Sequence, residues 1–312
     1  MRKTHQIVIS GVLAAGLMAA CSSQDALSEG AADADEASVV EERYGALSAE
    51  FVYPRSTDDE GVDVQAQFLD ARGVPVDSAL EALEVWMPRR GLEMESCQLS
   101  TGSASAPAGH EPVSLHLLDV GEIDVMSPQD TLTLEPRRLP DLLSSFYGVV
   151  YGSEWSDLGA RDFVEYYPGS DYRFIAPGSA QAGAFDVTLQ APDPIVLLAA
   201  NGEEIRDETV LSVAADEALE LVWASDDGVW STEEVFIDLS AGYGPDQTRI
   251  QCRARDHGAF SVSASRLREL SQFSDEVDLE IRRVRSGEAA IEGLDKVDFY
   301  FATTDKIELH FD

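Results

Sequence analysis

Short runs in which apolar and polar residues alternate are the feature that most constrains the fold of this 312-residue chain. In the second half, Leu219 to Trp223, Val235 to Leu239 and Ile250 to Ala254 each place their apolar side chains on one face. The last two runs, Val297 to Phe301 and Ile307 to Phe311, repeat the pattern. About nine short strands separated by turn residues are typical of an antiparallel β-sandwich.

The first half is β-rich as well, with less regular spacing. Strands are expected there at Val62 to Leu69, Leu83 to Trp86, Val113 to Leu118, Ile123 to Met126, Thr131 to Leu134, Phe146 to Tyr151, Tyr172 to Ile175 and Phe185 to Leu189. Ala79 to Val85 could form a short helix instead of a strand. In the second half, one short helix is expected at Ser265 to Leu270, with Ser263 or Ser265 as its N-cap.

A stiff, non-helical break at Ala191-Pro192-Asp193-Pro194 divides these two series. We therefore predict an all-β protein with two antiparallel sandwich domains, residues 46–191 and 195–312.

The second predicted domain resembles immunoglobulin-like sandwiches in one respect. Trp223 lies on the inward face of its run, as the core tryptophan of those domains does, and Cys252 follows 29 residues later, where their second cysteine falls. No cysteine stands at Val210 to Val213, where the first one would fall. The resemblance is therefore to the architecture, without a family assignment.

The N-terminal residues have the composition of a secretory leader. Arg2 and Lys3 precede an apolar stretch from Ile7 to Ala20 that is short for a membrane span. Met18-Ala19-Ala20-Cys21 resembles the lipobox of bacterial lipoproteins, although Met18 stands where leucine is usual. The resemblance implies that residues 1–20 are removed and that Cys21 is acylated. Ser22 after this cysteine favours the outer membrane of a Gram-negative bacterium, by the same analogy.

Residues 21–45 are predicted to form a disordered tether behind the lipidated cysteine. They are rich in Ser, Ala, Asp and Glu, and their only aromatic residue is Tyr44. Such a stretch cannot bury enough apolar surface to order itself, and repulsion between its carboxylates should extend it.

The chain is strongly acidic, with 22 basic and 58 acidic residues and a formal net charge of −36. This charge argues against nucleic-acid binding, which needs clustered lysines and arginines. It also argues against a basic membrane-binding patch, so the lipid on Cys21 must supply the membrane attachment. The remaining partner classes are a protein and a glycan.

Two cysteines, Cys97 and Cys252, remain after Cys21. A disulfide between them would suit a secreted protein and, by the loop-entropy argument, would contribute roughly 4 to 5 kcal/mol. Their assignment to separate domains favours two free, buried thiols instead. The sequence leaves both alternatives open.

Motifs for catalysis are missing from the sequence. It has no Gly-x-Ser-x-Gly elbow, no phosphate-binding glycine loop and no His-Glu-x-x-His, and its histidines are not at metal-ligand spacing. We therefore predict a non-enzymatic binding or scaffold module without a cofactor. The alternatives are a glycan-binding module that uses Trp155 and Trp230, and a hydrolase that uses distant carboxylates.

Two acidic loops are candidate calcium sites. Asp58, Asp59 and Asp63, and likewise Asp226 and Asp227, gather oxygen ligands around a glycine, as calcium requires. Neither loop has the spacing of the twelve-residue calcium loop, so solvated turns are the favoured interpretation.

The segments 119–125 and 256–262 share the pattern Asp-x-Gly-x-apolar-x-Val. This pattern predicts a hairpin turn used twice, because aspartate caps its own backbone and glycine accepts a positive φ.

Overall fold

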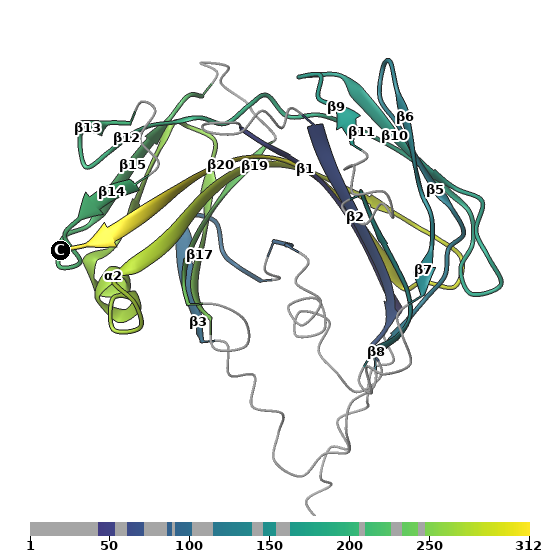
Figure 1. Cartoon of the computed structure of the whole chain (residues 1–312), viewed down its shortest axis with the longest axis horizontal. Coiled ribbons are helices and arrows are strands. Elements are labelled where there is room, and N and C mark those ends of the chain that lie inside the picture. Colours follow the sequence, from purple (N-terminus) through teal and green to yellow (C-terminus); the bar gives the residue numbers. More distant parts are fainter. Residues whose placement is uncertain are drawn as a thin grey trace, which may run out of the picture. The chain divides into compact units, whose positions relative to one another are not determined.

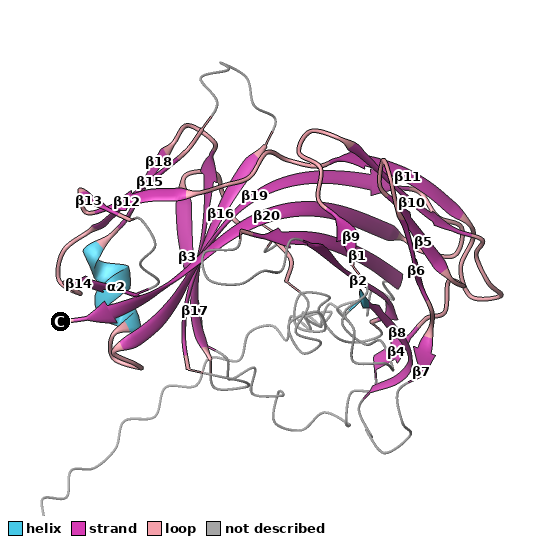
Figure 2. Cartoon of the chain, turned by 45° about the horizontal axis from the view of Figure 1, so that its top comes forward, coloured by secondary structure: helices cyan, strands magenta, loops and turns pink. Residues whose placement is uncertain are grey.

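The computed structural model describes ten segments of the chain. They are residues 43–53, 61–71, 86–88, 91–101, 115–138, 146–153, 163–205, 210–225, 233–242 and 247–312. All of them belong to one compact unit, Val39–Asp312. Strands dominate, and α2 (Ala264–Leu270) is the single helix in these segments (Figure 2). The prediction of an all-β protein is confirmed. Within the described segments, no helix has the length and apolar character needed to span a bilayer.

A twelve-stranded sheet forms the centre of this unit. Its main path is β3 (Ser96–Thr101), β17 (Thr248–Arg255), β16 (Glu234–Ala241), β19 (Glu276–Ala289), β20 (Lys296–Phe311), β1 (Arg43–Val52), β2 (Gly61–Asp70), β4 (Leu115–Leu117), β8 (Phe146–Gly152) and β7 (Arg137–Arg138). β14 (Val210–Val213) pairs with β20, and β9 (Val164–Glu165) pairs with β2. Both β1 and β14 run parallel to β20, so the expectation of purely antiparallel pairing is wrong here.

Two four-stranded sheets cover one face of the central sheet. The first outer sheet has the order β11 (Phe185–Gln190), β10 (Asp171–Ala176), β5 (Ile123–Met126) and β6 (Thr131–Leu134). The second outer sheet has the order β13 (Glu203–Glu204), β12 (Leu197–Ala200), β15 (Leu219–Trp223) and β18 (Ala259–Val262). We call the opposite face of the central sheet the inner face.

Each outer sheet encloses its own hydrophobic core against the central sheet. The first core contains Phe68, Phe174 and Phe299, and the second contains Trp223 and Leu279. Burial of such large apolar side chains is the main favourable contribution to folding. The alternation found in the sequence therefore identifies the inward faces correctly.

The two cores meet at the predicted domain boundary, but the central sheet continues across it. Ala191, the first residue of the break, belongs to the first core, and Ile195, directly after the break, belongs to the second. β19 and β20 run through both regions, as Figure 1 shows. The first core therefore contains residues of both predicted domains, Phe174 from 46–191 and Phe299 from 195–312, and both ranges contribute strands to the central sheet.

β20 is one continuous strand where the sequence suggested two. Its odd-numbered residues face the same side throughout: Phe299 and Phe301 lie in the first core, and Ile307 and Leu309 lie in the second. The residues between these two apolar runs are mostly polar, so the sequence does not indicate that the strand continues through them. They nevertheless follow the strand period of two.

β1 begins at Arg43, inside the stretch predicted as a tether to residue 45. Tyr44 is fully buried, and its hydroxyl donates to Asp298 Oδ2 at 2.6 Å. The prediction is wrong for these residues because β1 is ordered by pairing with β2 and with the distant β20, which local composition cannot reveal.

The repeated Asp-x-Gly turns are not hairpins. Gly121 and Gly258 have φ values of 82° and 88°, as the pattern predicts. Each turn, however, carries the chain from a strand of the central sheet to a strand of an outer sheet. Asp119 Oδ1 accepts from the Gly121 amide at 2.8 Å, whereas Asp256 binds partners elsewhere.

Candidate functional site

Two consecutive arginines are buried in the middle of β19, and they form the candidate site. Arg282 and Arg283 are each 3% exposed. Because successive side chains of a strand point to opposite faces, the two guanidinium groups serve different sides of the central sheet. They lie in the part of β19 that pairs with both β16 and β20.

Arg282 binds three carboxylates on the inner face. Its Nη1 donates to Asp238 Oδ2 at 2.8 Å, its Nε donates to Glu50 Oε1 at 3.1 Å, and its Nη2 donates to Glu280. The guanidinium carbon lies 4.6 Å from the centroid of the Trp86 ring, within the range of a cation–π contact. Arg282 therefore joins β1, β16 and β19 with the segment before β3.

The same carboxylates accept further hydrogen bonds. Asp238 accepts from Trp86 Nε1 and from Gln251 Nε2, both at 2.8 Å. Glu280 lies 2.8 Å from Lys306 Nζ, and Glu50 accepts from Thr304. Buried charges are tolerated when they are paired and hydrogen-bonded in this way.

The electrostatics of this network favour the charged forms of Arg282 and Glu280. Burial alone would lower the pKa of Arg282, but Glu50, Glu280 and Asp238 outweigh it and raise that pKa above its ordinary value. Burial would raise the pKa of Glu280, but Arg282 and Lys306 outweigh it and lower that pKa to about 2. Both groups are therefore ionised at neutral pH.

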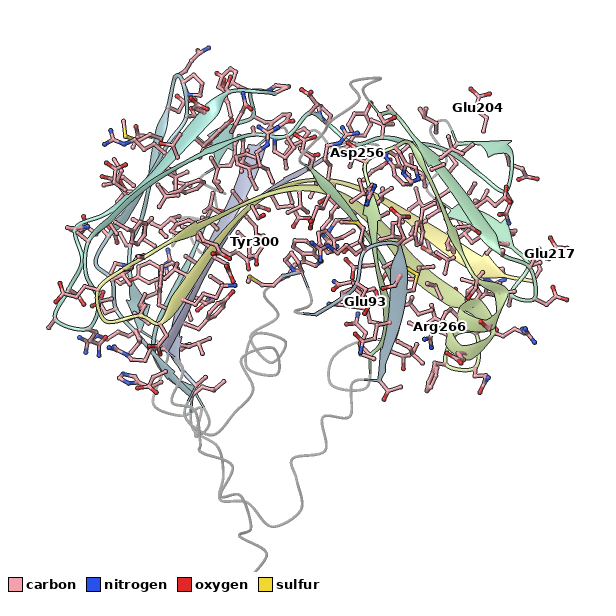
Figure 3. All side chains as sticks on the ribbon, turned by 180° about the vertical axis from the view of Figure 1, so that it is seen from behind. Glu93, Glu204, Glu217, Asp256, Arg266 and Tyr300 are labelled. Atoms are coloured by element: carbon pink, nitrogen blue, oxygen red, sulfur yellow. A yellow bond between two sulfur atoms is a disulfide. The ribbon has the colours of Figure 1, made fainter. Side chains whose placement is uncertain are left out.

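Arg283 lies on the opposite side, where the two cores meet. Its Nε donates to Asp256 Oδ2 at 2.7 Å, and its Nη2 donates to the Ala224 carbonyl at 2.6 Å. Its Nη1 donates to the carbonyls of Asp193 and Pro194 at 3.1 and 3.0 Å. Figure 3 labels Asp256 beside the second outer sheet.

Further hydrogen bonds hold the break between the cores on the central sheet. Thr303 Oγ1 donates to the Asp193 carbonyl at 2.9 Å, and the Leu197 amide donates to Asp305 Oδ2 at 2.7 Å. Thr303 pairs directly with Arg283, and Asp305 pairs with Ile281. The polar gap within β20 is therefore the attachment site of the connection between the two cores.

These two networks fix geometry rather than present reactive groups. Asp256, for example, also accepts from Trp223 Nε1 at 2.8 Å, which ties the largest side chain of the second core to Arg283. In the described segments, no group of three or more His, Cys, Asp or Glu side chains could hold a metal ion.

Most site residues predicted from the sequence lie outside the described residues: Cys21, Asp58, Asp59, Trp155, Asp226, Asp227 and Trp230. Asp63 is described. It lies on β2, where Ser153 Oγ donates to it at 3.4 Å. The candidate glycan and calcium sites therefore stay predictions.

Cys97 and Cys252 form a disulfide in the structure. They are directly paired on the antiparallel strands β3 and β17, with their Cα atoms 4.0 Å apart. The argument against this bridge fails because β3 belongs to the edge of the central sheet beside β17, and not to a separate domain. The bridge also lies within one sheet, so it is unlike the inter-sheet disulfide of immunoglobulin domains.

Sequence reasoning missed both arginines. Arg282 and Arg283 continue a clean alternation through Val277, Leu279 and Ile281, in a chain that has only 22 basic residues. Charged residues in the middle of an apolar strand are rarely buried unless they are paired. The position of the two arginines in an apolar strand was therefore evidence in the sequence that they are buried and paired. It does not identify the groups that they bind.

The structure defines the class as an all-β protein in which one twelve-stranded sheet carries two four-stranded sheets. No family model and no curated protein matches the sequence.

Proposed function

We propose that this chain is a lipid-anchored cell-envelope protein that acts as a non-enzymatic binding or scaffold module. The supporting observation is the buried Arg283 network, which bonds the connection between the two cores to the central sheet. The chain between the two cores is hydrogen-bonded to the central sheet at Asp193, Pro194 and Leu197. This arrangement suits a binding module, because it holds the surfaces on both cores at fixed positions.

The proposed anchor is the lipid on Cys21, and the proposed location is the outer membrane. Support comes from the leader and from the net charge of −36, which disfavours direct adsorption to anionic headgroups. We further propose that each core with its outer sheet is one sandwich of immunoglobulin-like architecture, adapted so that the two share the central sheet.

The anchor is tested by expressing Cys21→Ala and fractionating the cells. The variant should leave the membrane fraction, and mass spectrometry of the wild-type N-terminal peptide should find an acylated cysteine. Ser22→Asp is the matched control, since it should keep the protein on a membrane and move it to the inner one. A Cys21→Ala protein that stays in the membrane fraction refutes the anchor.

The binding or scaffold role is tested with the purified full chain. Hydrolysis of any member of a panel of glycoside and peptide substrates, abolished by substitution of a single carboxylate, would replace it with the hydrolase alternative. A specific signal on a glycan array, lost in Trp155→Ala or Trp230→Ala, would assign the ligand class to glycans.

A further inference from the structure

The central sheet ends at β3, and no strand in the described part of the chain pairs with the other side of β3. Figure 1 shows β3 beside β17 at one end of the sheet. None of the six residues of β3 is buried, whereas β16, two strands further into the sheet, buries most of its residues. β3 is therefore an edge strand.

The backbone groups that face this edge belong to alternate residues of β3. Cys97 and Cys252 lie directly opposite each other with their Cα atoms 4.0 Å apart, the close approach typical of a pair whose backbone groups do not bond to one another. The Glu95 amide donates to the Arg253 carbonyl at 2.8 Å, which agrees with this register. The amides and carbonyls that point away from β17 are therefore those of Cys97, Leu99 and Thr101.

The sequence of β3 lacks the features that usually protect an edge strand. Natural sheets blunt their edges with charged residues, with prolines or with very short strands. The opposite end of the central sheet has all three, because β7 consists of Arg137 and Arg138 alone and follows Pro136. β3 has the sequence Ser-Cys-Gln-Leu-Ser-Thr, with neither a charge nor a proline. One edge of the sheet is thus protected against pairing, and the other is open to it.

The disulfide holds the open edge in place. An edge strand without buried side chains opens easily unless something else fixes it. The bridge between Cys97 and Cys252 joins β3 covalently to β17, and Glu95 Oε1 accepts from the Arg255 amide at 2.9 Å just before β3 begins. A row of backbone groups that is fixed before binding loses little conformational entropy when another strand pairs with it.

Charge favours an extended segment of another protein over a second copy of this chain. A second copy carries the same net charge of −36 and would be repelled. The edge itself is locally basic, since β17 contains three arginines and neither β3 nor β17 contains a carboxylate.

Arg249 is the arginine at this edge that lacks a carboxylate partner. Arg253 pairs with Glu234, whereas Arg249 donates to the neutral Gln247 at 3.2 Å, and no carboxylate of the described segments binds it. Ser100 lies directly opposite Arg249, so a strand added beside β3 would meet Arg249 across a small side chain. A carboxylate on the added strand complements this position.

We propose that the open edge of β3 binds an extended segment of another protein, which adds a strand to the central sheet and places a carboxylate near Arg249. This inference rests on the proposed binding or scaffold role and gives it a binding site and a partner class. The backbone groups of Cys97, Leu99 and Thr101 supply the affinity, and Arg249 selects the direction of the segment.

The test uses the full chain in detergent and a short fluorescent peptide of alternating threonine and valine with one terminal aspartate. The control peptide has the same sequence but is N-methylated at alternate residues, so it cannot pair with a strand edge. Fluorescence anisotropy should show binding of the first peptide and not of the second. Hydrogen exchange followed by mass spectrometry should show slower exchange in residues 96–101 when the first peptide is bound.

A matched pair of substitutions tests the edge itself. Because the Leu99 amide points away from β17, Leu99→Pro removes a donor from the edge without removing a hydrogen bond within the sheet. It should weaken peptide binding about tenfold, whereas Leu99→Ala, which loses the same side chain but keeps the amide, should bind like the wild type. Circular dichroism checks the folding of both variants. Thr101→Pro, at an exposed position of the same edge, gives the same test if Leu99→Pro does not fold.

A second pair of substitutions tests the charge. Arg249→Gln should weaken binding of the aspartate peptide about threefold and leave binding of its asparagine analogue unchanged. Arg255→Gln, an exposed arginine at the other end of β17, is the control and should change neither.

The proposal is overturned if the N-methylated peptide binds as well as the unmodified one, or if Leu99→Ala weakens binding as much as Leu99→Pro. It is also overturned if exchange slows elsewhere and not in residues 96–101, or if Arg249→Gln behaves like Arg255→Gln. A concentration-dependent dimer in sedimentation velocity that Leu99→Pro abolishes would assign the edge to a second copy instead. These outcomes leave the membrane fractionation and the substrate panel unchanged, so they are distinguishable from a failure of the proposed function.

Discussion

Replacing Arg283 with methionine removes the donor group that holds the two cores together. The guanidinium makes five hydrogen bonds, two to Asp256 and one each to the carbonyls of Asp193, Pro194 and Ala224. Asp256, whose side chain is 3% exposed, would keep only the bond from Trp223. Loss of one partner of a buried ion pair costs about 3 to 5 kcal/mol, because the remaining charge is left without compensation.

The assay is urea denaturation of the folded protein, followed by circular dichroism. At a slope of about 3 kcal/mol per molar urea, the midpoint should fall by roughly 1 to 1.7 M. Hydrogen exchange should become faster in the segment around Ile195 and Leu197, since its attachment to the central sheet is weakened.

Two controls test whether the effect belongs to the buried Arg283 network. Arg173→Met removes an ion pair to Asp186 in which both side chains are about half exposed, and it should barely move the midpoint. Arg283→Met combined with Asp256→Asn should recover part of the loss, because no buried charge then lacks its partner. If Arg283→Met behaves like Arg173→Met, or if the second substitution adds its own full cost, the Arg283 network does not hold the cores together.

Three further predictions follow from the described contacts. Glu280, whose pKa is lowered from 4.5 to about 2, stabilises the fold by on the order of 3 kcal/mol above pH 4.5, and this contribution is lost as the pH falls towards 2. In urea titrations, the stability difference between wild type and Glu280→Gln should therefore shrink over that interval, and a constant difference contradicts the assignment. Gly148 has a φ of 120°, and an added Cβ would lie 1.9 Å from the Leu117 carbonyl oxygen, so Gly148→Ala should cost about 1 to 3 kcal/mol. Gly152→Ala, on the same strand with open space around it, should cost nothing measurable in the same assay. The double variant Cys97→Ser with Cys252→Ser should lose up to roughly 4 to 5 kcal/mol of unfolding free energy, and its melting temperature should not change with dithiothreitol. A wild-type melting temperature that is the same with and without dithiothreitol would contradict the bridge.

Local sequence patterns predicted the individual strands better than their assembly. Ile123 to Met126, Thr131 to Leu134 and Leu219 to Trp223 match β5, β6 and β15 at both ends. The helix was also predicted within one residue, and Ser263, one of the two predicted N-cap residues, is its N-cap, although the Ser263 side chain makes no capping hydrogen bond to the backbone. These elements are short, and their alternation or capping residues are local in the chain.

The prediction of the candidate site failed because its partners are distant in sequence. Arg282 reaches Glu50 across 232 positions, and Arg283 reaches the Asp193 carbonyl across 90. Nothing in the neighbourhood of either arginine specifies these partners. The same reason explains why the direct pairing of Cys97 with Cys252 could not be predicted from spacing alone.

The fold class, the inward faces of most strands and the position of the break at residues 191–194 can be read from the amino-acid sequence alone. These properties follow from side-chain period and from proline, which act over a few residues. The sharing of one sheet by both cores cannot be read from the sequence, because it depends on the pairing of β20 with β1, β14 and β19. The tertiary structure also shows why polar residues stand at the centre of β19 and β20. Arg283, Thr303 and Asp305 are buried, and hydrogen bonds to the chain between the two cores compensate for that burial.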